Sequence, residues 1–136
     1  MTTLKKIILV EDDEFDAELT MAELKSIPLA NEIVWLETGK EFIDFIETHG
    51  VEEIAVAILD LNMPLITGIE ALEIIREKNL PKFPIVVLSS SKEHPDIKRC
   101  HELEVSAFVT KPVKTEEFRT SVRTLGLFWG LMNKRP

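Results

Sequence analysis

Short apolar runs alternate five times with longer amphipathic segments along this chain of 136 residues. The runs are rich in β-branched residues and are bounded by glycine, proline or polar clusters, which is typical of buried strands. They lie at residues 7–10, 33–36, 55–59, 85–88 and 107–109. Helices are predicted over 14–27, from a Thr38 cap to Gly50, over 69–78, over 95–103 and after a Thr115 cap. This alternation predicts an α/β fold with a doubly wound, five-stranded parallel sheet.

The apolar positions of the first and last predicted helices define the faces that should pack on the sheet. Phe15, Leu19 and Ala22 fall near helical spacing in the first helix, and Phe118 and Val122 begin a stripe in the last that continues to residue 125. A stripe of this kind marks the buried side of an amphipathic helix. We therefore expect these residues to face the core.

Asp60 ends the most apolar stretch of the chain, which runs from residue 55 to residue 59. Pro64 then prevents a helix from continuing, and Gly68 permits a turn before the next periodic segment. Ligands of open α/β sheets bind at the carboxyl ends of the strands. A carboxylate placed there is costly unless it is solvated, hydrogen-bonded or bound to metal. Asp60 is therefore the candidate reacting group.

Polar side chains also follow three other predicted strands. Glu11 and Asp12 follow the first, Ser89 the fourth and Lys111 the fifth. All of them should lie at one edge of a parallel sheet, together with Asp60. Crowded carboxylates need a nearby cation, and hard oxygen ligands suit Mg²⁺. Lys111 and the Ser89 hydroxyl suit a phosphoryl group, and Asp60 could act as a nucleophile that forms an acyl phosphate.

The charge and composition exclude several classes of protein. The formal net charge of −8 argues against nucleic-acid or anionic-membrane binding, because both need a basic surface. The single cysteine, Cys100, cannot form an internal disulfide and fits a reducing compartment. Neither a signal peptide nor a run of transmembrane length is evident. We therefore expect a cytoplasmic protein.

Four motifs in this order resemble the receiver domain of two-component response regulators. They are Leu-Val-Glu-Asp at 9–12, Leu-Asp-Leu-Asn-Met-Pro at 59–64 with the glycine at 68, Leu-Ser at 88–89 and Thr-Lys-Pro at 110–112. The resemblance covers nearly the whole chain. It implies a flavodoxin-like fold with strand order 2-1-3-4-5. It also implies a phosphoacceptor signalling protein, rather than an enzyme acting on a separate substrate, whose phosphoryl donor is a sensor histidine kinase.

The resemblance assigns a role to each matching metal and acceptor residue. Asp60 matches the phosphoacceptor aspartate. Glu11 and Asp12 match the acidic pair, with Asp12 preferred as the direct Mg²⁺ ligand. Asn62 matches the residue whose backbone carbonyl binds the metal. The adjacent Asp13 is expected to be a first-turn helix acid, favoured by the helix dipole.

Three further residues match the switch and the phosphate contact. Ser89 matches the switch hydroxyl, and Phe108 matches an aromatic switch position that is often tyrosine. Since phenylalanine has no hydroxyl, any switching there must work through ring packing. Lys111 matches the phosphate-binding lysine, and its bond to Pro112 is expected to be cis. Ser90 is interpreted as an ordinary turn residue.

The C-terminal end suggests a subgroup and an oligomeric state. The expected organisation is one receiver domain over 1–136, with 126–136 as a tail. About two dozen residues follow Pro112, too few for an attached output domain. With Phe128 and Trp129 near the C-terminus, the Glu11-Asp12 start and the missing output domain, the chain is similar to the stand-alone regulators paired with bacterial phytochrome kinases. That resemblance implies a homodimer through the last strand, the last helix and the tail.

Two other functions remain open at this point. A phosphatase of the haloacid-dehalogenase type also uses a strand-end aspartate and Mg²⁺, but its second acid falls where this chain has Asn62. A scaffold that binds partners without phosphorylation is the other alternative. Glu11, Asp12, Asp60 and Lys111 argue against it. The three histidines have no metal-ligand spacing and are expected at the surface.

Overall fold

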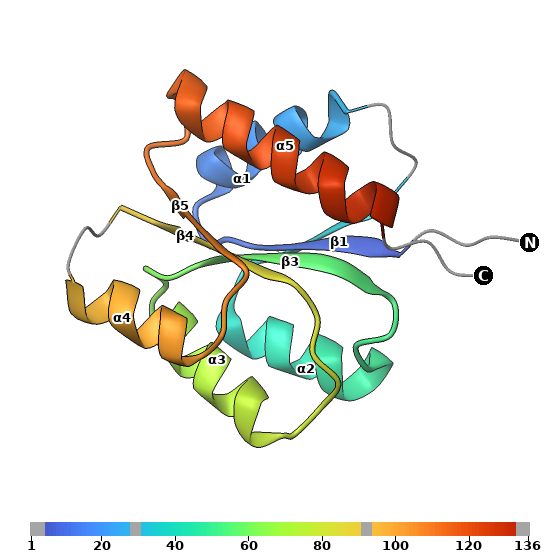
Figure 1. Ribbon diagram of the computed structural model, residues 1–136, viewed down its shortest axis with the longest axis vertical. Coiled ribbons are helices and arrows are strands. Elements are labelled where there is room, and N and C mark those ends of the chain that lie inside the picture. The colour runs from blue at the N-terminus through green and yellow to red at the C-terminus, as the bar shows by residue number, and fades with distance from the viewer. Residues whose placement is uncertain (1–4, 28–30, 91–93, 133–136) are drawn as a thin grey trace, which may run out of the picture.

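A five-stranded parallel sheet forms the centre of the molecule, with the strands in the order β2-β1-β3-β4-β5 (Figure 1). The computed structural model describes residues 5–27, 31–90 and 94–132. The strands are β1 (Lys6–Val10), β2 (Ile33–Leu36), β3 (Ile54–Asp60), β4 (Ile85–Ser89) and β5 (Ala107–Thr110). The helices are α1 (Glu14–Lys25), α2 (Gly39–His49), α3 (Gly68–Glu77), α4 (His94–Glu102) and α5 (Glu116–Met132). The predicted fold class and strand order are confirmed.

Helices cover both faces of the sheet. Helices α1 and α5 lie on one face, and α2, α3 and α4 lie on the other (Figure 1). Two buried apolar clusters fill the spaces between the layers. Alternate residues of β3 enter different clusters, with Ala57 and Leu59 in one and Val56 and Ile58 in the other. A strand that is buried on both faces in this way must be apolar throughout, as the sequence indicated.

Four strands, β1, β3, β4 and β5, extend further than predicted, and in β3 and β4 this places a predicted site residue within the strand. Asp60 is the last residue of β3, and Ser89 is the last residue of β4. Both belong to the hydrogen-bonded sheet, where Asp60 is opposite Leu88 and Ser89 is opposite Thr110. Their backbones are therefore held by neighbouring strands rather than by loops.

The predicted inward face of α1 is wrong at Phe15 and Ala22, whereas Leu19 is half-buried and packs against the core, as expected. Phe15 is 53% exposed and Ala22 is also exposed, whereas Ala17, Thr20 and Leu24 are buried. The small side chains of Ala17 and Thr20 allow this face to pack closely. The apolar pattern missed the face because one of its buried residues is polar and one exposed residue is aromatic.

Several helix ends follow the sequence, and others differ. Thr38 caps α2 through a capping box, as its position predicted. Asp13 is the N-cap of α1, not a first-turn residue, and its carboxylate accepts a hydrogen bond from the Asp16 amide at 2.9 Å. Helix α5 continues through Gly126 to Met132, so the expected tail is helical up to that residue. Residues 133–136 lie outside the described part.

Gly68 is required by a close approach of the backbone and not by its conformation. A Cβ atom at this position would lie 2.6 Å from the Asp60 carbonyl oxygen and 2.6 Å from the Leu61 Cα. We expect Gly68→Ala to lower the free energy of unfolding by about 1–3 kcal/mol, because backbone atoms must shift. Urea unfolding measures this. In Gly126→Ala the new Cβ meets a flexible methyl group of Leu24, so a smaller loss is expected; equal losses would contradict the explanation.

Candidate phosphoacceptor site

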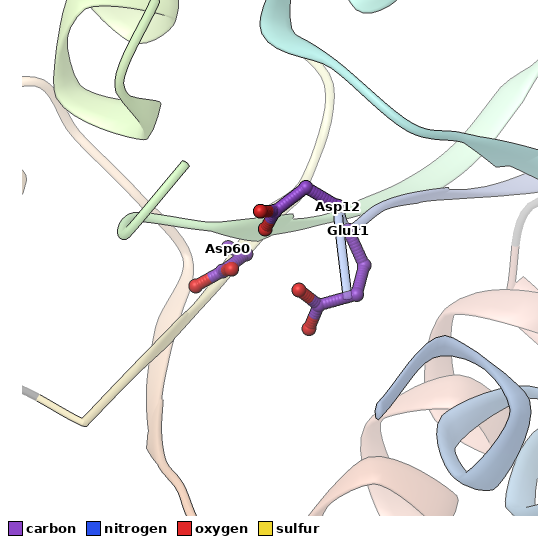
Figure 2. A group of neighbouring side chains, drawn as sticks. All are labelled: Glu11, Asp12 and Asp60. Atoms are coloured by element: carbon purple, nitrogen blue, oxygen red, sulfur yellow. The ribbon is translucent and has the colours of Figure 1, made fainter. Parts of the chain in front are cut away.

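Three carboxylates meet at the carboxyl edge of the sheet. Glu11 and Asp12 follow β1, and Asp60 ends β3, the strand beside it. Each offers a carboxylate oxygen, and these oxygens lie within 4.8 Å of one another. Figure 2 shows the three side chains converging from the two strand ends. Glu11 and Asp60 are buried, whereas Asp12 is exposed. The predicted acidic cluster is therefore present in the fold.

Lys111 supplies a positive charge beside these acids. Its Nζ lies 2.7 Å from Glu11 Oε1 and 3.5 Å from Asp60 Oδ2. It also lies 3.0 Å from Oδ2 of Asp16, a residue of α1 that the strand-end pattern of the sequence does not indicate. Only 11% of the Lys111 side chain is exposed, so these pairs are partly shielded from solvent. The Lys111–Pro112 bond is cis, as expected.

The acid–base properties of Glu11 and Lys111 reflect this crowding. Burial, and then a hydrogen bond involving Asp60, raises the pKa of Glu11 to about 8, although Lys111 acts in the opposite direction. Burial lowers the pKa of Lys111, but the hydrogen bond to Glu11 and the charges of Asp60 and Glu11 outweigh it, so its pKa is raised. Burial also raises the pKa of Asp12. The site therefore holds more negative charge than one lysine can neutralise.

The raised pKa of Glu11 predicts that metal-free protein loses stability as the pH rises. Between pH 5 and 7 the unfolded chain has lost this proton and the folded chain retains it, so deprotonation favours unfolding. The free energy of unfolding should fall by about 2–3 kcal/mol over this range, at about 1.4 kcal/mol per pH unit. Urea unfolding in EDTA checks this. Glu11→Gln should flatten the dependence; an unchanged slope would contradict it.

The other predicted site residues are distributed around the acids. The backbone N–H of Asn62 donates to Asp60 Oδ1 at 3.1 Å, and the side-chain Nδ2 of Asn62 donates to Ser90 Oγ at 3.0 Å. Ser89 is fully buried, and its carbonyl accepts from the Lys111 amide at 2.9 Å. Ser90, interpreted from sequence as a turn residue, is the serine that lines the site cavity.

An open cavity of about 720 Å³ contains the acidic cluster. Its lining includes Asp60, Asn62, Ser90 and Lys111, with Phe15 also among the lining residues. Lys114 Nζ lies 5.2 Å above the Phe15 ring and also lines the cavity. Phe108 does not line it and instead packs against the cluster under α2, α3 and α4. The cavity thus brings together the acids, Asn62 and Lys111. The two predicted switch residues, Ser89 and Phe108, are not among its lining residues.

The donor set fits a hard divalent cation. Three carboxylate oxygens within 4.8 Å of one another repel, and the lysine alone leaves them undercompensated. Oxygen ligands of this kind suit Mg²⁺ or Mn²⁺ better than softer metals. Glu11, Asp12 and Asp60 are the residues that would hold the ion.

Comparison with known proteins identifies the family. A family model described as "Response regulator receiver domain" matches residues 7–123. The chain is 31% identical over 134 residues to "Probable methanogenesis regulatory protein FilR2" of Methanothrix harundinacea, covering 96% of this chain and 86% of that protein. It is 32% identical over 130 residues to "Response regulator Rcp1" of Synechocystis sp., covering 92% and 88%. The chain belongs to the response regulator receiver domain family.

Solved structures give the same result. The Mn²⁺-bound form of Rcp1 matches with a TM-score of 0.80 and 31% identity, covering 93% of this chain and 94% of that one. The bacteriophytochrome response regulator AtBRR matches with a TM-score of 0.73 and 39% identity, covering 93% and 96%. The similarity to phytochrome-associated regulators that was expected from the sequence is confirmed.

Family membership fixes the general activity. A receiver domain is a phosphoacceptor signalling module that binds a divalent metal and works with a histidine kinase. The haloacid-dehalogenase alternative is therefore excluded. Within the described ranges, no helix is both long and apolar enough to cross a membrane.

Proposed function

We propose that this receiver accepts a phosphoryl group from a histidine kinase on Asp60 in a Mg²⁺-dependent reaction. The surroundings of the Asp60 carboxylate support this proposal. The Asp60 carboxylate lies in an open cavity, with two acids within 4.8 Å and the Lys111 ammonium at 3.5 Å. A nucleophilic carboxylate needs this combination of metal ligands and positive charge to receive a phosphoryl group.

The transfer needs no further reactant. An oxygen of Asp60 attacks the phosphorus of a phosphohistidine, the phosphorus–nitrogen bond breaks, and the imidazole nitrogen keeps the electron pair. The product is an acyl phosphate on Asp60. Hydrolysis reverses the state: water attacks phosphorus, the bond to Asp60 breaks, and a water proton passes to solvent. Lys111 offsets charge on the transferring group.

The metal would be held by Glu11, Asp12, Asp60 and the backbone carbonyl of Asn62. When bound, it neutralises charge on the phosphoryl oxygens. The Asn62 amide orients Asp60 by donating to Oδ1, which leaves Oδ2 on the side of Lys111. The Rcp1 structure with Mn²⁺ supports the same kind of site in a relative.

Ser89 and Phe108 are proposed to transmit the phosphorylated state. Ser89 lies at the end of β4, and Phe108 is on the neighbouring strand, opposite Val87. Because side chains alternate along a strand, Ser89 points to the same face as Val87, the face against which Phe108 packs. The Ser89 hydroxyl can donate to a phosphoryl oxygen, and repacking of the ring would shift the population towards a second arrangement.

Intact mass spectrometry tests the proposal. The protein is incubated with acetyl phosphate in Mg²⁺ or in EDTA. We expect one alkali-labile phosphoryl group with Mg²⁺ and none with EDTA. No labelling, despite detectable Mg²⁺ binding and a folded protein, would contradict acceptance from small donors; a failure with a cognate kinase as well would favour the phosphorylation-independent scaffold.

We infer that the cognate kinase is a bacterial phytochrome and that the exchange takes place in the cytoplasm. AtBRR is named as a bacteriophytochrome response regulator and is 39% identical to this chain. Phosphotransfer from a purified bacterial phytochrome kinase should be at least about tenfold faster than from an unrelated histidine kinase, a difference of about 1.4 kcal/mol. Equal rates would contradict this partner.

A homodimer through β5, α5 and the C-terminal segment is part of the proposal. Leu127 and Phe128 are exposed on α5, with Phe128 55% exposed, and aromatic residues are enriched at such interfaces. Phe128→Glu should convert the dimer to a monomer in sedimentation velocity. Leu65→Glu, at an apolar residue that is 94% exposed outside α5, should leave it intact. A monomeric wild type, or a dimer that persists in Phe128→Glu, would contradict this interface.

A further inference from the structure

The ammonium group of Lys111 contacts three carboxylates, and one of them lies outside the acidic cluster. It has three N–H donors. It donates to Glu11 Oε1 at 2.7 Å and to Asp16 Oδ2 at 3.0 Å, and Asp60 Oδ2 lies at 3.5 Å. Asp16 is not among the three acids that could hold a metal. Its contact with Lys111 therefore needs a separate explanation.

The two hydrogen-bonded carboxylates differ in how easily they can release the lysine. Glu11 is completely buried, so losing its ammonium partner would leave a buried carboxyl group that water cannot reach to replace the lost donor. The Asp16 side chain is 26% exposed, so water can replace the lysine there. When a new anion arrives beside Lys111, breaking the contact with Asp16 therefore costs less free energy than breaking the contact with Glu11.

The local structure holds Asp16 in place for this contact. Asp16 lies in the first turn of α1, and its amide donates to the Asp13 N-cap carboxylate at 2.9 Å. The cap fixes where the helix begins and hence where the Asp16 side chain leaves it. The carboxylate then reaches Lys111, which is 95 residues away in the sequence.

We propose that Asp16 is a positioning residue that holds Lys111 in the resting state and releases it to the phosphoryl group on Asp60. This inference rests on the proposed function and specifies its regulation. Asp16 and Asp60 lie within 3.5 Å of the same nitrogen, so a phosphoryl group on Asp60 would compete with Asp16 for that ammonium. The negative charge of Asp16 also opposes that of the incoming group. Asp16 therefore disfavours the phosphorylated state, which makes the switch easier to reset.

Removing the Asp16 charge should strengthen binding of a phosphoryl mimic. Asp16→Asn keeps the shape but offers only a neutral, weaker acceptor to Lys111. In saturating Mg²⁺, this variant should bind beryllofluoride about tenfold more tightly than wild type, equivalent to about 1.4 kcal/mol. Its initial rate of labelling by acetyl phosphate should also rise. Tryptophan fluorescence can follow the titration, because Trp35 Nε1 donates to the Glu11 carbonyl at 2.8 Å.

Two controls separate exchange at Lys111 from other effects. Asp13→Asn removes the same charge from the cavity rim but keeps a good N-cap, so a change below about twofold is expected. Asp16→Glu restores the carboxylate and should return the affinity towards that of wild type. Thermal unfolding of each variant shows whether affinity follows overall stability instead.

The outcomes distinguish this inference from the proposed function. Tighter binding in Asp16→Asn, reversed in Asp16→Glu and nearly absent in Asp13→Asn, supports it. Unchanged or weaker binding in Asp16→Asn would overturn it while leaving phosphorylation of Asp60 intact. An equal gain in Asp13→Asn would also overturn it, because the effect would then be general electrostatics. Wild type that neither binds beryllofluoride nor becomes labelled would overturn both.

Discussion

Asp60→Ala is expected to abolish phosphoryl labelling completely. The acceptor oxygen is lost, because Asp60 is the carboxylate that ends the middle strand and lies beside the Lys111 ammonium in the cavity. The fold should survive, because one of three crowded acids is removed from a site in which they repel. In the absence of metal, the variant should unfold at a temperature equal to or above that of wild type.

Intact mass after incubation with acetyl phosphate and Mg²⁺ measures this result. Asp44→Ala is a suitable control, since it removes an exposed acid of α2 that pairs with Lys40 away from the cavity. The control should be labelled like wild type. Persistent labelling of a folded Asp60→Ala protein would mean that another residue accepts the phosphoryl group.

Lys111→Met is expected to produce the largest loss of stability among the site variants. Removing the ammonium leaves Glu11 and Asp60 buried without their cation. Breaking a buried ion pair by removing one partner typically costs about 3–5 kcal/mol, and because Glu11 can keep its proton the expected loss is about 3 kcal/mol. Labelling should also slow, because the charge that offsets the phosphoryl group is absent.

Urea unfolding in EDTA at pH 7 measures the stability of this variant. Lys40→Met is the matched control, because Lys40 forms a single exposed pair with Asp44. Exposed pairs contribute little to stability because water screens them, so little change is expected there. Similar losses in the two variants would show that burial of the carboxylates is not what makes Lys111 important.

Much of the fold could be predicted because the central elements have simple patterns. Every residue of β3 is buried, so an uninterrupted apolar run identified it. Thr38 could be predicted as a cap because a threonine directly before a helical apolar pattern is a local signal. The inward face of α1 could not be found from apolar spacing, since Thr20 is buried and Phe15 is exposed.

The candidate site, like the fold, could be predicted from the sequence only in part. Glu11, Asp12, Asp60 and Lys111 could be grouped because the strand ends of a parallel sheet share one edge. The contact between Lys111 and Asp16 could not, because it depends on where α1 begins and on a pairing across 95 residues. A hydrogen bond from Asn62 brings Ser90 to the cavity, a contact that strand register alone does not specify.

Peptide mapping after borohydride reduction identifies the residue that carries the phosphoryl group. Borohydride reduces an aspartyl phosphate to homoserine, which mass spectrometry can locate in a peptide. After treatment with acetyl phosphate and Mg²⁺, we expect homoserine at position 60 and unchanged aspartates at positions 12, 13 and 16. Homoserine at another position, or at none in a protein that carries a labile phosphoryl group, would contradict Asp60 as the acceptor.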